Sequence, residues 1–244
     1  MKQRLWVGLL AMGAAGCAIQ TPHLAINRYP VAQQAAYYPE ALPGRLGVMP
    51  LADQRPPQER QGRKPPGIFL LLWNRRTGDY YTGDRIFGEP VAPQLSQGLV
   101  DYLQAAHVFT ETVSVPASAH SPTALQRLGD EHAADYLLGG EWHHFFGSQH
   151  QQCSMFILPL YFINTWGWSN GKSLPWGQTT ALLVLYQADT GELVWRAPIE
   201  QTWTMPRDTD SMAEAAMKSF TATAAQLATQ LRQLSLAAPP VSSE

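Results

Sequence analysis

Histidine, cysteine and acidic side chains gather between residues 141 and 153, and these are the residue types that bind transition metals. The stretch contains Glu141, His143, His144, His150 and Cys153. Because His and Cys are usual zinc ligands, a metal-assisted hydrolase built on His143, His150 and Cys153 is one hypothesis for the function. On a strand, however, His143 and His144 point to opposite faces and cannot both bind one ion without a bulge. Glu141 and His143 share a face. We therefore expect a structural or surface role here, with no resident metal and no cofactor.

Two further motifs match catalytic sequences only in part. Residues 189–191 (DTG) spell the aspartic-protease triplet, but that chemistry needs two carboxylates and no second copy exists. A hairpin turn is the expected structure for DTG. Residues 167–173 (GWSNGKS) have three residues between the glycines where a phosphate-binding loop has four. The chain also lacks G-x-S-x-G and H-E-x-x-H, so we expect no catalytic residue and no enzyme activity.

Two apolar segments stand where loops are expected, although loops are normally polar. Residues 67–73 read GIFLLLW, and residues 155–168 read MFILPLYFINTWGW. Burying one Leu, Ile or Phe gains about 1.5–3 kcal/mol, so these segments should bury against each other, a partner or lipid. Three structures stay open: extra strands with a local core, an interface, or membrane hairpins. Pro159 and the lack of alternation count against the hairpins.

The two insertions, near 67–81 and 155–177, also supply the candidate partner-binding residues. Trp, Tyr and Arg are frequent interface anchors, with Arg suited to the polar rim. The candidates are Trp73, Arg75, Arg76, Tyr80, Tyr81, Trp166, Trp168 and Trp176. The basic residues from Arg55 to Arg85 alternate with four acids, which is typical of a solvated loop face. Attraction of that face to anionic lipid or a cell-wall polymer is the alternative.

The elements that must position these residues alternate between strand and helix. Strands are predicted at 45–51, 108–115, 136–146, 180–186 and 192–204, and helices at 93–106, after Ser121-Pro122 and after Ser211. Apolar periodicity marks the helices, and capping residues mark two of their starts. The order β-α-β-α-β-β-β-α predicts an α/β fold: a single sandwich of a mixed, mainly antiparallel sheet with helices packed on it. The domain should span 45–235, with a flexible tail at 236–244.

The first residues have the features of a secretory signal, with Lys2 and Arg4 before a short apolar run. Small residues stand directly before Cys17, which resembles the bacterial lipoprotein signal, although Ala14 stands where leucine is usual. The resemblance implies cleavage after residue 16 and a covalent lipid on Cys17. Since Ala18 and not aspartate follows, it also implies sorting to the outer membrane, with the domain facing the periplasm. Residues 17–44 then form a Pro-rich tether.

Composition sets broader limits on what the chain can be. Its 244 residues suit one domain with tails, and 45% hydrophobic residues suffice for a core. A net charge of -2 argues against nucleic-acid binding, which needs a basic face. Two cysteines rule out a disulfide framework.

Several segments together resemble one group of envelope proteins. The lipidated cysteine, the tether, RLGVMPLAD, VFTETVSV, ADYLLGGEW and ALLVLYQADTGELVW are similar to the group that contains the N-terminal domain of TolB, the curli-secretion lipoprotein CsgG and the lipoprotein activators of penicillin-binding proteins. The resemblance implies a non-catalytic, lipid-anchored scaffold or accessory protein for envelope assembly or transport. Its partners would be outer-membrane lipid and an envelope protein or a second copy. An oligomeric outer-membrane export component is the alternative that the curli lipoprotein suggests.

Overall fold

The computed structural model describes residues 24–64, 67–70, 73–88, 90–156 and 171–234. The strands are β1 (Leu42–Val48), β2 (Ala52–Asp53), β3 (Gly67–Leu70), β4 (Trp73–Tyr81), β5 (Phe109–Ser114), β6 (Tyr136–Phe156), β7 (Gly171–Lys172), β8 (Trp176–Gln187) and β9 (Leu193–Thr204). The α-helices are α2 (Pro57–Gln61), α3 (Val91–Ala106), α4 (Pro122–His132) and α5 (Met212–Arg232). Short 3-10 helices are η1 (Ile26–Arg28), η2 (Ala32–Gln34) and η3 (Asp84–Ile86).

All nine described strands join one mixed sheet, and most of its pairings are antiparallel. Strand β6 is the centre, because β1, β2 and β4 pair with one edge in succession while β8 and β7 pair with the other. Strands β5 and β1 pair in parallel with each other, as β1 does with β6. The predicted fold class is therefore confirmed. The β3–β4 hairpin is an addition between the first strand and the first long helix.

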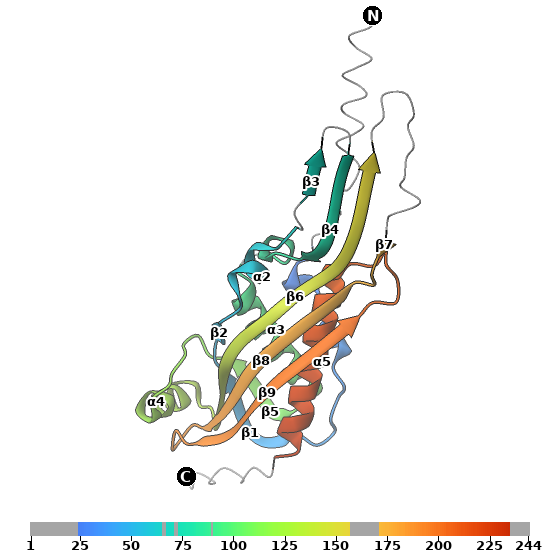
Figure 1. Ribbon diagram of the computed structural model, residues 1–244. Coiled ribbons are helices and arrows are strands. Elements are labelled where there is room, and N and C mark those ends of the chain that lie inside the picture. Colours follow the sequence, from blue (N-terminus) through green and yellow to red (C-terminus); the bar gives the residue numbers. More distant parts are fainter. Residues whose placement is uncertain (1–23, 65–66, 71–72, 89, 157–170, 235–244) are drawn as a thin grey trace, which may run out of the picture.

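The long helices α3 and α5 cover one face of the sheet, which we call the inner face (Figure 1). The core lies between these two helices and the sheet. It is filled by the buried residues Leu46, Leu99, Trp142, Phe145, Leu183, Ile199 and Phe220. The opposite, outer face is covered by α4 only at one end, where a second buried cluster includes Leu125, Leu137 and Ala188. Among the described residues no other long helix lies on the outer face.

Local chemistry explains where several elements begin and turn. The hydroxyl of Ser121 accepts a hydrogen bond from the Ala124 amide, and that of Ser211 accepts one from the Glu214 amide, so both predicted N-caps are confirmed. DTG lies in the turn between β8 and β9, where Gly191 has φ +69°. Gly140 of β6 has φ +141° and lies against the Leu182 carbonyl, so the backbones of β6 and β8 approach closely at this position.

Residues 24–41 do not form the free tether that their proline content predicted, which is a correction. Ile26 and Val31 are buried, and the Tyr38 amide donates to the Ala106 carbonyl at the end of α3. Arg232 from the end of α5 donates to the Glu40 carbonyl and stacks on Tyr38. Residues 24–41 lie against the domain because their scattered apolar side chains pack on α3, on its side away from the sheet. The expected tether therefore shrinks to the residues before 24.

In the described residues no helix is both long enough and apolar enough to cross a membrane. The signal, Cys17 and the tail 236–244 lie outside the described residues, so the predictions for them stay predictions.

Candidate functional site

The described parts of the two apolar insertions belong to an arm of the sheet that extends beyond α3 and α5 (Figure 1). Strand β6 continues to Phe156, where the sequence predicted an end at 146, and β4 pairs with it from Tyr81↔Ser148 to Trp73↔Phe156. Strand β3 pairs with β4, while β7 pairs with the opposite edge of β6. The insertions therefore form extra strands of the same sheet.

The predicted partner-binding residues differ in their exposure and in whether the structure describes their side chains. The backbones of Trp73, Arg75 and Arg76 lie on β4, opposite Phe156, Ser154 and Cys153, while their side chains lie outside the described part of the chain, as do Trp166 and Trp168. Tyr81 and Trp176 are half-buried. Tyr80 is only 5% exposed, because it turns to the inner face beside the start of α5, so its role as an exposed anchor is a wrong prediction.

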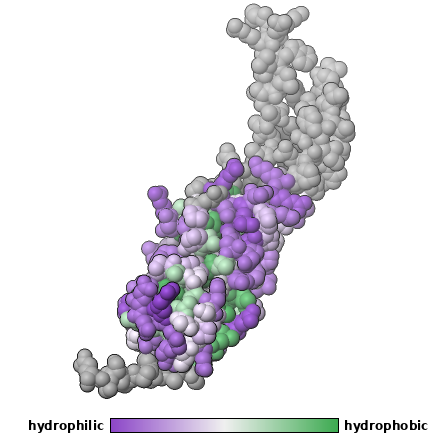
Figure 2. Space-filling view, turned by 90° about the vertical axis from the view of Figure 1, so that its left-hand side faces the viewer, coloured by the Kyte–Doolittle hydropathy of each residue, from purple (hydrophilic) through white to green (hydrophobic). Residues whose placement is uncertain are grey.

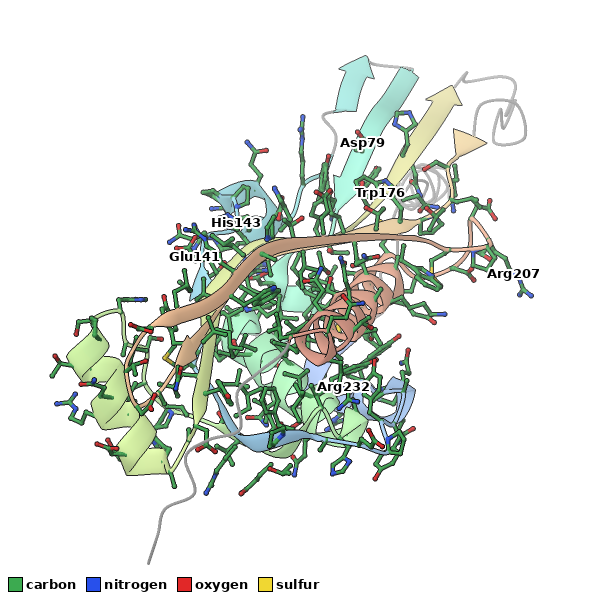
Figure 3. All side chains as sticks on the ribbon, turned by 90° about the horizontal axis from the view of Figure 1, so that it is seen from below. Asp79, Glu141, His143, Trp176, Arg207 and Arg232 are labelled. Carbon is green, nitrogen blue, oxygen red and sulfur yellow. The ribbon has the colours of Figure 1, made fainter. Side chains whose placement is uncertain are left out.

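An aromatic cluster of Tyr81, Phe146 and Trp176 lies at the base of the arm. The ring centroids of Tyr81 and Phe146 are 5.1 Å apart, and those of Phe146 and Trp176 are 5.3 Å apart in an edge-to-face geometry. Trp176 projects from the face opposite α5 (Figure 3). The cluster joins the two insertions across β6. Phe146 is not among the residues predicted from the sequence, because it lies in an ordinary strand pattern.

The outer face continues from this cluster along β8. Leu182 and Val184 alternate with buried residues and are themselves half-exposed, and the exposed Pro198 of β9 lies opposite Leu182. Glu141, His143 and Arg196 lie around these three residues, which we call the outer strip. An apolar centre within a charged rim is the composition of a transient protein interface.

The histidines pair with separate acids and do not form the ligand set of the hydrolase hypothesis. His143 Nε2 lies 3.3 Å from Glu141, which confirms that these two share a face. His144 Nδ1 lies 2.7 Å from Glu59, and His150 Nδ1 lies 2.9 Å from Asp79. His150 lies seven positions after His143 on β6, which is roughly 23 Å at about 3.3 Å per step.

A bulge between Trp142 and His144 accommodates His143, which is the irregularity that the sequence allowed for. In the described residues no group of three or more His, Cys, Asp or Glu side chains could hold a metal ion, and the Cys153 side chain is outside that set.

A buried charge network lies under the root of the arm and corrects the view of Arg55 as part of a solvated face. Arg55 is 2% exposed and forms ion pairs of 2.9 Å with both Asp53 and Asp84. Burial by itself would raise the pKa of Asp53, but the hydrogen bonds and charge of Arg55 outweigh it and hold the pKa of that carboxyl below its ordinary value. The network joins β2 and α2 to η3.

No protein-family model matches the chain, and none of the curated proteins matches it either. Among solved structures the chain is similar to a Xanthomonas campestris protein of the DUF330 family, with 12% identity, a TM-score of 0.45, and 80% of this chain and 88% of that chain covered.

It is also similar to the PelC dodecamer of Paraburkholderia phytofirmans (12% identity, TM-score 0.39, 78% and 92% covered) and to lipoprotein GNA1162 of Neisseria meningitidis (10% identity, TM-score 0.34, 77% and 99% covered). These values do not assign a family, so the resemblance to the TolB and CsgG group stays a prediction.

Proposed function

We propose that this chain is a lipid-anchored accessory protein of the bacterial envelope, which faces the periplasm and acts by protein–protein contacts. The anchor rests on Cys17 and the small residues before it. The contact function rests chiefly on one observation: Tyr81 and Trp176, from two separate insertions, meet on Phe146 on a sheet face that no long helix of the described residues covers at this point.

Half-buried aromatic residues suit this role. They are held rigidly by Phe146, so a partner loses little side-chain entropy in ordering them. The outer strip extends the apolar area, and Glu141, His143 and Arg196 supply a rim that can pair with polar groups. Figure 2 shows pale and hydrophobic residues interspersed with hydrophilic ones along the body.

In-cell photocrosslinking tests the contact surface. A photoreactive residue at Trp176 or Leu182 should give a discrete adduct, whereas the same residue at Trp203 should give none. Trp203 is a matched control, because it is 41% exposed but lies under Lys218 of α5 on the inner face. Trp176→Ala should weaken the contact about tenfold or more, as loss of an aromatic anchor does.

The mass of the adduct identifies the partner class. A heterologous adduct supports an accessory role, and an adduct of two copies supports the oligomeric export component. The same adducts at Trp176, Leu182 and Trp203 would show random collision and would contradict the proposed surface.

Membrane fractionation tests the anchor separately. Wild-type protein should sediment with the outer membrane and incorporate labelled palmitate, because several acyl chains anchor firmly where one does not. Cys17→Ser should abolish the label, and Ala18→Asp should leave the label but move the protein to the inner membrane. A Cys17→Ser protein that still incorporates palmitate would contradict the anchor.

A further inference from the structure

A cavity of 440 Å³ lies at the root of the arm, on the inner side of Tyr81. One wall is the chain that leaves α2, at 61–64, and the other is the end of β4 with η3. Met212, the first residue of α5, forms the base together with Ile86. The exposed residues on this end of the body are largely hydrophilic (Figure 2).

The backbone fixes the distance between the two walls. Arg63 and Tyr81 exchange two backbone hydrogen bonds, of 3.2 Å and 2.9 Å. A Cβ atom at Gly62 would stand 2.8 Å from the Gly83 nitrogen, and Gly62 has φ +75°, so only glycine allows the walls to cross this closely. The cavity is therefore a built feature of the fold.

Three cations line the cavity, and no carboxylate of the described lining residues balances them. They are Arg63, Lys64 and Arg85. Two acids close to these cations in sequence already have partners: Asp84 pairs with Arg55, and Glu59 pairs with His144. Within the described ranges no ion pair joins the three lining cations to an acid. The cavity is therefore positive.

Tyr80 adds a second, independent observation that points to a ligand. Its side chain lines the cavity and is 5% exposed, yet its hydroxyl has no hydrogen-bond partner in the described protein. Buried hydroxyl groups normally have a partner, because an unsatisfied one is unfavourable. The hydroxyl oxygen is enclosed by protein atoms, so the ring has to turn toward the cavity before its O–H can donate to an anion there.

We propose that this cavity binds a phosphate group. Arg63, Lys64 and Arg85 would surround the anion, because guanidinium and ammonium groups are the usual phosphate binders. The Tyr80 hydroxyl would donate to a phosphate oxygen, and Ile86 and Met212 would contact the organic part of the ligand. The phosphate belongs either to a soluble phosphate compound or to an anionic phospholipid headgroup. The site does not depend on the protein contacts proposed above.

Binding experiments with two probes distinguish the sources. The full chain carrying Cys17→Ser, which removes the expected acyl anchor, is titrated with inorganic phosphate by calorimetry. It is then mixed with vesicles of phosphatidylcholine alone or of equimolar phosphatidylcholine and phosphatidylglycerol, and flotation is compared. Binding of inorganic phosphate supports a soluble ligand. Binding only to the anionic vesicles, above the level for neutral vesicles, supports a headgroup.

Matched variants then test whether the observed binding takes place in this cavity. Arg63→Gln/Arg85→Gln should weaken it roughly thirtyfold, since each cation near an anionic surface contributes about a factor of five. Tyr80→Phe should weaken it about tenfold while leaving the melting temperature equal or higher, because the unpaired hydroxyl is removed. Arg28→Gln/Arg127→Gln removes the same charge from exposed positions on η1 and α4 and should have no effect.

Three results would overturn the site. They are no binding of either probe, equal losses in the two charge variants, or unchanged affinity in Tyr80→Phe.

Discussion

Gly147→Ala is expected to lower the free energy of unfolding by about 3 kcal/mol or more, which is a large effect for one added methyl group. Gly147 of β6 lies opposite Gly177 of β8, and the first turn of α5 crosses the inner face directly over this pair. An added Cβ at Gly147 would overlap the Met212 carbonyl, and one at Gly177 would overlap the Ala215 backbone. Because backbone atoms of a capped helix are in the way, no rotamer change can relieve the overlap.

Gly139→Ala on the same strand is the control for this prediction. The only close atom there is the terminal methyl of Met49, 2.7 Å from the added Cβ, and a flexible side-chain end can move. We expect a loss below about 1.5 kcal/mol for that variant. Urea unfolding followed by circular dichroism compares the two. Equal midpoints would show that α5 does not depend on the close approach at Gly147.

Sequence patterns predicted the parts of the fold whose signals are local. The start of α5 follows from Ser211 and Glu214, and its buried stripe of Ala216, Phe220 and Leu227 follows from helical periodicity. The turn at Gly191 likewise depends on four consecutive residues. Each of these signals lies within a few residues of the structure that it specifies.

The arm and the course of residues 24–41 depend on contacts between distant residues, which local patterns do not carry. Residues 147–154 (GSQHQQCS) are largely polar and show no apolar alternation, yet they continue β6 because β4, some seventy residues earlier, supplies hydrogen-bond partners. Ile26 is buried only because α3 lies beside it. The tertiary context overrides the composition in both cases.

In the candidate site, too, some residues follow from local sequence signals and others only from contacts between distant residues. Aromatic residues in apolar loops are unusual, and this signal predicts Tyr81 and Trp176 as anchors, whereas Phe146, which contacts both, lies in an ordinary strand pattern. Arg55 was assigned to a solvated face because its neighbours in sequence are charged. Its burial depends on Asp84, which is 29 residues away.

Arg55→Met should destabilise the protein by about 3–5 kcal/mol at neutral pH, because it leaves the Asp53 and Asp84 carboxylates without their cation. Arg55 donates to both carboxylates through five hydrogen bonds, one of them from its backbone amide, and its side chain is 1% exposed. These bonds hold α2 against η3, and each of these two helices continues into one wall of the phosphate-binding cavity. Arg55→Met should therefore also weaken phosphate binding. Arg45→Met is the control, because its 3.3 Å pair with Glu111 is exposed and should contribute less than about 1 kcal/mol.

The pH dependence separates lost charge pairing from lost packing. The pKa of Asp53 is lower in the folded wild type than its ordinary value of 3.8, so the stabilisation from its pairing is complete above that value and disappears as the pH falls through the folded pKa. The difference between wild type and Arg55→Met should therefore shrink on acidification below 3.8. Arg55→Met/Asp53→Asn/Asp84→Asn should recover most of the stability at neutral pH, because no unpaired carboxylate remains buried. A gap between wild type and Arg55→Met that is the same at neutral and acidic pH, together with no recovery in the triple variant, would assign the loss to packing of the Arg55 side chain.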